Sequence, residues 1–361
     1  MMSRPTKGTL KRKGMMKSTC FAMRAAAAVL SAGKITAAET VSAADGTFAT
    51  RVARWSGDAK GAYALYYDDG TASALELAAP VLVKYGVPGS FYICFGWFEK
   101  NPAGGLAWID FARRHMDTIR LANHTWSHCG ATNYEHAVKE IGRNADYIRK
   151  GLGLPGDARI SFARPGGVPW KLTPEEVARV LAETHCDPRP DDDKVFTEER
   201  VGGKTHLSLA DAVRDMDSAE KNGTFEKLLM HGVGGDWFRF PAGEHELIVR
   251  ELARRHADGR LWTGASMDVQ DYEKERDGAK VKGVEAAKDG FVVDLACSTD
   301  AAVYRFPLTL VTSVPENVDS VAVSQGKHFA RFPAVGGRAV YDVLPISGPV
   351  KVEFRYDVRK K

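Results

Sequence analysis

The chain has 361 residues, of which 44% are hydrophobic and 27% charged, so wholesale disorder and a collagen-like fibre are excluded. No run approaches the roughly eighteen apolar residues of a membrane span, and the length predicts about two domains. Residues 1–38 carry eight of the 50 basic residues and no acidic one, which leaves 42 basic against 46 acidic residues elsewhere. The body of the chain is therefore mildly acidic, and this argues against a nucleic-acid partner.

The first 43 residues are typical of a leader. A basic start precedes the Ala-rich stretch 25–32, and small residues follow at 36–38 and 41–43. This order predicts a signal peptide, a mature start near residues 39–44 and a periplasmic or secreted protein without an integral membrane span. The alternative is a disordered basic tail. None of the five cysteines forms a Cys-x-x-Cys pair, so a zinc ribbon is not indicated, and any disulfide pairing stays open.

Strand and helix patterns alternate through the middle of the chain. Residues 61–97 contain a strand, a helix and a second strand, which together form a βαβ unit. The same alternation continues to a last short strand at 261–263. We therefore expect an α/β fold, a distorted (β/α) barrel of about seven units, over residues 44–284. Residues 285–361 instead show short β runs separated by turn residues, which predicts a small all-β, sandwich-like module.

Four polar clusters follow predicted strands of the barrel. Because active sites of such barrels lie at the carboxyl ends of the strands, these clusters are expected to converge. Each cluster also has a simpler interpretation: a surface turn, two solvent-facing histidines, an arginine at a turn, and a buried structural histidine. They are Asp68-Asp69, His124 with His128, Arg164-Pro165-Gly166-Gly167, and His231 followed by glycines and Trp237.

The residue types of these clusters suit a hydrolytic metal site. Of two adjacent carboxylates, one can bind a cation while the other stays free as a base. His124 and His128, four residues apart, would share one face of a helical turn and could bind one ion. The guanidinium of Arg164 could orient a carboxylate, and His231 could act as a general acid.

In their order and spacing the clusters resemble the polysaccharide deacetylase family of metal-dependent carbohydrate esterases. The family motifs Thr-Phe-Asp-Asp-Gly, His-(Ser/Thr)-x-x-His, Arg-Pro-Pro-(Tyr/Phe)-Gly and Leu-x-His correspond here to Tyr66–Gly70, His124–His128, Arg164–Gly167 and Leu229–His231. The family's Asp-x-x-Asp-Trp motif has no clear counterpart, and the run 186–191 matches it poorly. The resemblance implies an incomplete barrel and does not identify the residue that adjusts the acidity of His231.

The resemblance also implies roles for individual residues. Asp69, His124 and His128 would hold one divalent cation, Zn²⁺ in the first place, with Co²⁺ or Ni²⁺ as alternatives. Asp68 would accept a proton from water and Arg164 would fix Asp68, while His231 would protonate the leaving group. The residues expected to contact substrate are Pro165, Gly166 and Trp237.

The expected activity is hydrolysis of N-acetyl or O-acetyl groups on an acetylated oligo- or polysaccharide, with release of acetate. One alternative is an amidohydrolase of the same superfamily that acts on a small non-sugar amide. The other is a catalytically dead glycan-binding protein, against which the intact acidic and histidine residues argue. The sugar, the linkage, the role of the β module and the oligomeric state stay open.

Overall fold

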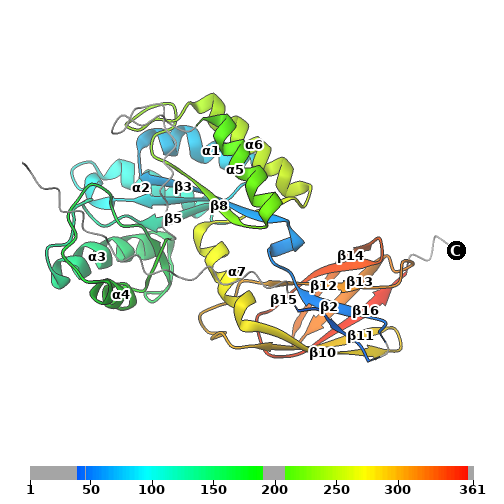
Figure 1. Cartoon of the computed structure of the whole chain (residues 1–361). Helices are drawn as coiled ribbons and strands as arrows, with labels where there is room; N and C mark the ends of the chain where they lie inside the picture. The colour runs from blue at the N-terminus through cyan, green and yellow to red at the C-terminus, as the bar shows by residue number, and fades with distance from the viewer. Residues whose placement is uncertain (1–38, 45, 190–207, 357–361) are drawn as a thin grey trace, which may run out of the picture. The chain divides into compact units, whose positions relative to one another are not determined.

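The structure is a computed structural model that describes residues 39–44, 46–189 and 208–356 (Figure 1). The predicted leader lies outside these residues except for its last few positions. Within the described part of the chain, no helix combines the length and the apolar character needed to span a membrane.

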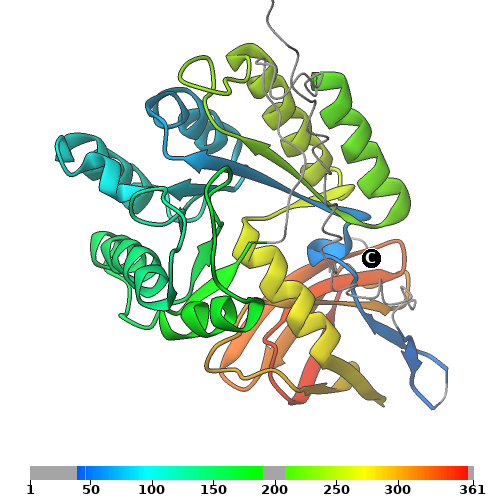
Figure 2. The same ribbon diagram turned by 60° about the vertical axis from the view of Figure 1, so that its left-hand side comes forward.

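The first of two sheets is a parallel sheet of seven strands, which forms the barrel. Its strand order is β7-β6-β5-β4-β3-β8, with β9 paired to the first residues of β3. The sheet curves without closing, which confirms the incomplete barrel (Figure 2). The strands are β3 (Gly61–Asp69), β4 (Gly89–Ile93), β5 (Ile119–Asn123), β6 (Ile160–Phe162), β7 (Cys186–Pro188), β8 (Phe225–Met230) and β9 (Leu261–Thr263).

Helices surround the outside of this sheet (Figure 2). They are α1 (Ala79–Tyr85), α2 (Pro102–Arg114), α3 (Tyr134–Leu152), α4 (Pro174–Glu183), α5 (Leu209–Asn222), α6 (Ala242–Ala257) and α7 (Ser266–Gly278). Short turns of other helix types lie at η1 (Ser56–Asp58), η2 (Ala74–Ala78) and η3 (Phe95–Phe98). The π-helical turn η2 ends at Ala78 and α1 begins at Ala79, so Pro80 lies in the first turn of α1, where its missing N–H costs no helical hydrogen bond.

Strand β3 is buried on both faces along its whole length. Tyr63, Leu65 and Tyr67 pack beneath the helices, whereas Ala64 and Tyr66 pack inside the barrel with residues of β4, β5 and β8. Since side chains alternate along a strand, Asp68 continues the inner row. The apolar pattern of β3 therefore delivers one carboxylate to the inside of the barrel at the end of the strand.

The second sheet is antiparallel and has nine strands in the order β1-β2-β12-β15-β14-β13-β16-β11-β10. It confirms the predicted all-β module, and its core, which includes Phe291, Leu310 and Tyr341, also contains Ala62, Trp262 and Tyr272 from the barrel segment. The strands are β1 (Val41–Ser42), β2 (Ala49–Val52), β10 (Ala279–Ala287), β11 (Gly290–Cys297), β12 (Leu308–Ser313), β13 (Ser320–Gln325), β14 (His328–Val335), β15 (Arg338–Val343) and β16 (Gly348–Arg355).

The sheets do not follow the predicted boundaries after residues 43 and 284. Strand β2, which we assigned to the barrel, pairs with β12 of the antiparallel sheet, and β1 pairs with β2. Strand β10 also begins six residues before the predicted start of the β module at residue 285. The pairing of β2 with β12 joins residues far apart in the chain, such as Val52 and Leu310, and carries no local sequence signal. The sequence pattern therefore gave no sign that β2 belongs to the antiparallel sheet.

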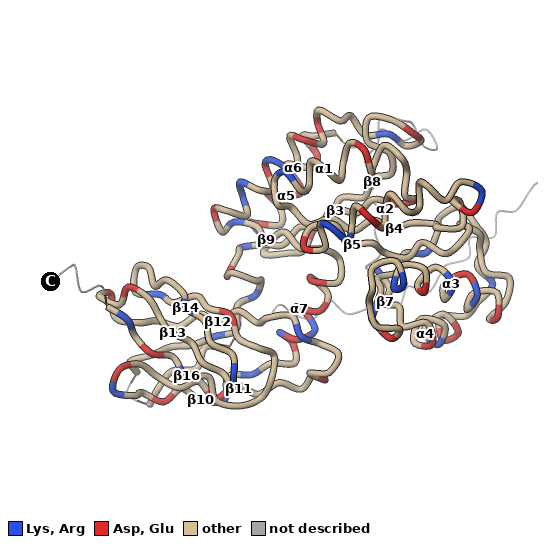
Figure 3. Tube along the Cα trace, turned by 180° about the vertical axis from the view of Figure 1, so that it is seen from behind, with Lys and Arg blue, Asp and Glu red and all other residues tan. Residues whose placement is uncertain are grey.

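Charges of both signs are distributed over the barrel helices and the β module (Figure 3). Many of them pair on the surface, for example Lys84 with Glu246 and Arg254 with Asp258. This mixed distribution agrees with the mildly acidic composition of the body of the chain.

Candidate active site

The carboxyl end of β3 carries two buried carboxylates, Asp68 and Asp69. Asp69 has a left-handed backbone with φ of 75°, and Gly70 follows with φ of 72°. A non-glycine residue in this conformation costs of order 1–3 kcal/mol, a strain that clusters at functional sites. A Cβ at Gly70 would lie 2.6 Å from the side chain of Ile93, so only glycine fits behind the two carboxylates.

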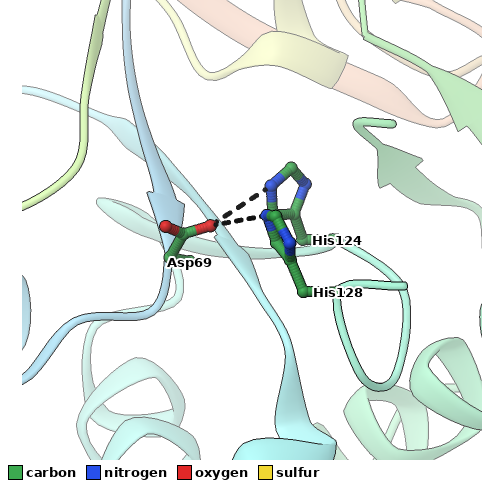
Figure 4. Close-up of side chains that lie close together, drawn as sticks. All are labelled: Asp69, His124 and His128. Atoms are coloured by element: carbon green, nitrogen blue, oxygen red, sulfur yellow. Dashed lines mark ion pairs between the residues drawn. The ribbon is translucent and has the colours of Figure 1, made fainter. Parts of the chain in front are cut away.

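Asp69, His124 and His128 converge on one point (Figure 4). Oδ1 of Asp69 lies 3.4 Å from Nε2 of His124 and 3.3 Å from Nε2 of His128. This Oδ1 atom is buried and accepts no hydrogen bond from the described residues. A buried carboxylate oxygen that faces two imidazole nitrogens fits a cation, and the oxygen and nitrogen donors are those of a three-ligand zinc site.

Neighbouring groups orient two of these side chains, His124 and Asp69. The Nδ1 atom of His124 lies 2.9 Å from the carbonyl oxygen of Ala163, so a proton on Nδ1 leaves Nε2 free to bind an ion. The indole nitrogen of Trp237 donates to Oδ2 of Asp69 over 2.5 Å. These hydrogen bonds direct Nε2 of His124 and Oδ1 of Asp69 toward the same point.

The two histidines do not lie on a helical turn, as their spacing predicted. They belong to an irregular loop after β5, in which Thr125 and His128 have left-handed φ angles of 64° and 59°. The Thr125 hydroxyl accepts the backbone N–H of His128 over 3.1 Å. The tight turn that results brings both imidazoles to one side, by a different geometry from the expected one.

Asp68 is held by Arg189 and not by Arg164. The guanidinium of Arg189 forms a bidentate pair with Asp68, with nitrogen–oxygen distances of 2.6 and 3.2 Å. Arg189 also lies 4.4 Å from the ring centroid of Tyr92 inside the barrel. Arg164, to which we assigned this role, is exposed to solvent. The orienting arginine therefore comes from the end of β7, in the run where the sequence shows no clear family motif.

Opposing effects set the acidities of the two carboxyls. Burial raises the pKa of Asp68, but Arg189 and the neighbouring imidazoles more than offset it, so its pKa falls below the ordinary value. The pKa of Asp69 is lowered further, since His124 and His128 outweigh its burial. Conversely, the contact with Asp69 raises the pKa of His128. Both carboxylates are therefore ionised at neutral pH.

His231 follows strand β8 and is mostly buried. Burial lowers its pKa, although the charges of Asp68 and Asp69 partly oppose this effect. Its Nδ1 atom is buried and has no hydrogen-bond partner among the described residues, while the ring of Phe238 lies 5.0 Å away between centroids. Among the described residues no carboxylate forms a hydrogen bond with Nδ1 of this histidine.

Two exposed tryptophans stand beside the histidines. Trp237, a predicted substrate contact, is 41% exposed, and Trp97, which the sequence analysis missed, is 42% exposed. Their rings meet edge to face with centroids 5.7 Å apart, and Trp97 also lies 5.5 Å from His128. Trp97 follows strand β4, so the rule that singled out the other strand ends could have found it.

Two other predicted substrate contacts lie in the loop after β6. Pro165 is buried and Gly166 is exposed, and no atom lies within 4 Å of a Cβ placed on Gly166. The geometry therefore shows no close backbone approach that would require glycine at this position. A role for Pro165 and Gly166 in substrate binding stays a prediction.

The fold and the site together define an α/β barrel with a candidate three-ligand metal centre at the carboxyl ends of its strands. Residues 56–183 match the family model described as polysaccharide deacetylase. The match confirms the resemblance seen in the sequence, and this segment of the chain is a polysaccharide deacetylase domain. It includes Asp68, Asp69, His124 and His128 and ends before Arg189 and His231.

Solved structures with the same type of domain are only distantly similar. The peptidoglycan deacetylase PdaC from Bacillus subtilis is 20% identical, with a TM-score of 0.42 and coverage of 60% of this chain and 94% of that one. A family 4 carbohydrate esterase from Streptomyces lividans, in complex with acetate, is 19% identical, with a TM-score of 0.35 and coverage of 56% and 92%. No curated protein matches the chain. These likenesses are too weak to carry a functional conclusion.

Proposed function

We propose that the protein is a metal-dependent carbohydrate deacetylase that hydrolyses N-acetyl or O-acetyl groups. The proposal depends mainly on one observation. The orphan Oδ1 of Asp69 and two imidazole nitrogens surround one point, next to a second carboxylate that an arginine holds ionised. One carboxylate thus remains to bind an ion and the other remains to act as a base.

Asp69, His124 and His128 would hold the divalent cation, Zn²⁺ in the first place, with Co²⁺ or Ni²⁺ as alternatives. Such an ion supplies Lewis acidity to an acyl carbonyl and to an attacking water. Three protein ligands are the number typical of a catalytic zinc site, since a closed structural site uses four.

In the reaction, Asp68 accepts a proton from the water whose oxygen attacks the acyl carbon. Arg189 keeps Asp68 ionised and fixes the plane of its carboxylate through the bidentate pair. When the carbon–nitrogen or carbon–oxygen bond breaks, His231 donates a proton to the leaving atom. The products are acetate and the deacetylated sugar.

The two exposed tryptophans support a sugar substrate. Trp97 and Trp237 present aromatic surface next to His128 and Asp69, and the apolar C–H face of a pyranose ring packs well on such surface. A small planar amide would not need two aromatic side chains. This favours a carbohydrate over the small-molecule amidohydrolase alternative.

The activity is tested by acetate release from a panel of N-acetylated and O-acetylated glycans, with metal analysis of the same sample. We expect acetate release that a chelator abolishes. Asp69→Ala should lose the bound ion of this centre together with the activity, whereas Asp117→Ala, at an exposed aspartate, should change neither. Full metal occupancy at this centre in Asp69→Ala would contradict the ligand assignment. Turnover of small amides without acetate release from any glycan would favour the amidohydrolase.

We also propose that the protein is exported to the periplasm or the cell exterior. The basic start and the Ala-rich stretch of residues 1–38 support this proposal. Amino-terminal sequencing of protein from the native host should find a first residue between 39 and 44. Retention of Met1 or Met16 would contradict export by cleavage of this leader.

A further inference from the structure

A second group of potential metal ligands lies next to the deacetylase site. Cys129, His136 and Glu140 each offer one ligand atom, and the three atoms lie within 4.8 Å of one another. The Sγ atom of Cys129 is 3.6 Å from Nε2 of His136. None of these residues has a role in the proposed reaction, and the sequence analysis did not single them out.

The local structure explains why the three side chains meet. His136 lies in the first turn of α3, and Glu140 follows four residues later on the same face of the helix. Cys129 comes directly after His128, in the loop that leads to the helix. The Asn133 side chain caps α3 by accepting the backbone N–H of His136 over 2.8 Å, which fixes where the helix begins.

The imidazole of His136 is oriented by Thr132. The Oγ1 atom of Thr132 lies 3.2 Å from Nδ1 of His136, so a proton on Nδ1 can be donated to this hydroxyl while Nε2 points toward Cys129. The backbone N–H of Thr132 donates to the same Nδ1 over 3.4 Å, so Nδ1 accepts this hydrogen bond in the structure. Binding of a cation at Nε2 requires the other tautomer, in which Nδ1 donates to the Thr132 hydroxyl in place of this bond.

Glu140 is a buried carboxylate that the described residues leave without a cationic partner. Its Oε2 accepts the backbone N–H and the hydroxyl of Ser127, each over 2.9 Å. Glu140 is 9% exposed, and no described lysine or arginine forms an ion pair with it, since the nearby Arg143 pairs with Glu99. Burial of an ionised carboxylate is costly unless a positive charge compensates it, so this position favours a bound cation.

We propose that Cys129, His136 and Glu140 form a second metal site, distinct from the Asp69 centre, and that it binds Zn²⁺. A thiolate, an imidazole and a carboxylate make a set that suits zinc, and water can complete four-coordination. The thiol proton passes to solvent when Sγ binds the ion. The bound ion ties the start of α3 to the loop that carries His124 and His128, and so fixes the ligands of the neighbouring centre.

Cobalt substitution of the full chain tests this site. We expect the metal-free protein to take up about two Co²⁺ ions per chain and to develop thiolate-to-cobalt charge-transfer absorption in the near ultraviolet. Cys129→Ser should abolish this absorption and reduce the uptake to about one ion, and His136→Gln should weaken both. Cys297→Ser, at another half-buried free cysteine, should change neither.

Several outcomes would overturn the second site. They are uptake of a single ion without thiolate absorption, absorption that persists in Cys129→Ser, and unchanged uptake in both variants. Simple hydrogen bonding among the three side chains would then account for their proximity. If circular dichroism shows that Cys129→Ser does not fold, His136→Gln decides the question.

The second site and the proposed activity can fail independently. Asp69→Ala should lose one ion and keep the thiolate absorption, because Asp69 is not a ligand of the second site. Thiolate absorption in a protein that releases no acetate would support the second site and contradict the deacetylase. Acetate release by a protein that binds one ion without thiolate absorption would support the deacetylase and contradict the second site.

Discussion

Buried polar groups differ between two regions of the molecule, the carboxyl end of the parallel sheet and the core of the antiparallel sheet. In the barrel, Oδ1 of Asp69 and Nδ1 of His231 are buried without a hydrogen-bond partner among the described residues. In the β module, Thr312 contacts both Thr50 and Tyr341 through hydroxyl oxygens 2.8 Å apart. The hydroxyls of Thr50, Thr312 and Tyr341 thus satisfy one another in the core of the module, while Asp69 and His231 keep unpaired atoms where chemistry is proposed.

Backbone strain follows the same division. The positive φ angles of Asp69, Thr125 and His128 all lie at the candidate metal centre. In residues 279–356, all of which the structure describes, only glycines have positive φ. Asp58 and His185 also have positive φ, but they precede β3 and β7 and lie outside the candidate site. Strained backbone costs stability, so the three strained residues at the candidate metal centre are consistent with a functional role there.

The largest effect that would test this contrast is expected from Asp68→Asn. The amide cannot accept a proton, and removal of a general base typically lowers the rate about 10²–10⁴-fold. The bound metal should remain, because Asp68 is not a proposed ligand. Activity assays combined with metal analysis measure both properties, and a near-normal rate would contradict the role of Asp68 as the base.

His231→Ala should cause the next largest loss, and the size of the loss should depend on the leaving group. An amine must be protonated to leave, whereas a nitrophenolate need not be, so an N-acetyl substrate should suffer more than an activated acetyl ester. Equal losses on the two substrates would indicate an orienting role.

The pH dependence of the wild-type protein tests the same residue. Burial lowers the pKa of His231, so its acidic form is lost at lower pH than that of an ordinary histidine. The alkaline limb of kcat/KM should therefore lie on the acid side of the usual histidine range, and His231→Ala should flatten it.

A smaller effect is expected from Arg189→Gln, with Arg164→Gln as its matched control. Loss of the bidentate pair leaves Asp68 buried without its main positive neighbour, so the pKa of Asp68 rises and the acidic limb of the pH profile moves to higher pH. Loss of such an orienting contact typically costs about 10–100-fold in activity. Arg164→Gln should leave the acidic limb in place. A shift of this limb in Arg164→Gln but not in Arg189→Gln would instead support the role predicted for Arg164 from the sequence.

The smallest effect is expected in the β module. Tyr341→Phe removes the buried hydroxyl that contacts Thr312 and should lower the free energy of unfolding by about 1 kcal/mol. The values of kcat and KM should not change, because the residue lies in the core of the β module. Denaturant unfolding together with steady-state kinetics measures both properties. A loss of activity without a loss of stability would contradict the functional separation of the barrel site and the β module.

The sequence singled out the three side chains that converge at the candidate metal centre, because their signals are local. Asp69 ends an apolar strand, and His124 and His128 stand in a short polar run after another strand. The helical turn expected for the histidines was wrong, since the left-handed residues Thr125 and His128 build a loop instead. Neither residue is a type that marks such a conformation.

Long-range partners could not be predicted in the same way. Arg189 reaches Asp68 across 121 positions of the chain, from a strand of three residues in a run without a recognisable pattern. Helix α7 was also missed, because it is strongly charged and lacks a clear apolar stripe. In both cases tertiary packing, and not local propensity, determines the structure.

The pairing of β2 with β12 makes the barrel an insertion between two parts of the β module. A gene fragment that begins at residue 56, where the family match starts, would lack β2 and leave β12 with an open edge. Grafting this module onto another enzyme would therefore require two splice points, one on each side of the barrel, and a simple carboxyl-terminal fusion of residues 279–356 would transfer an incomplete sheet.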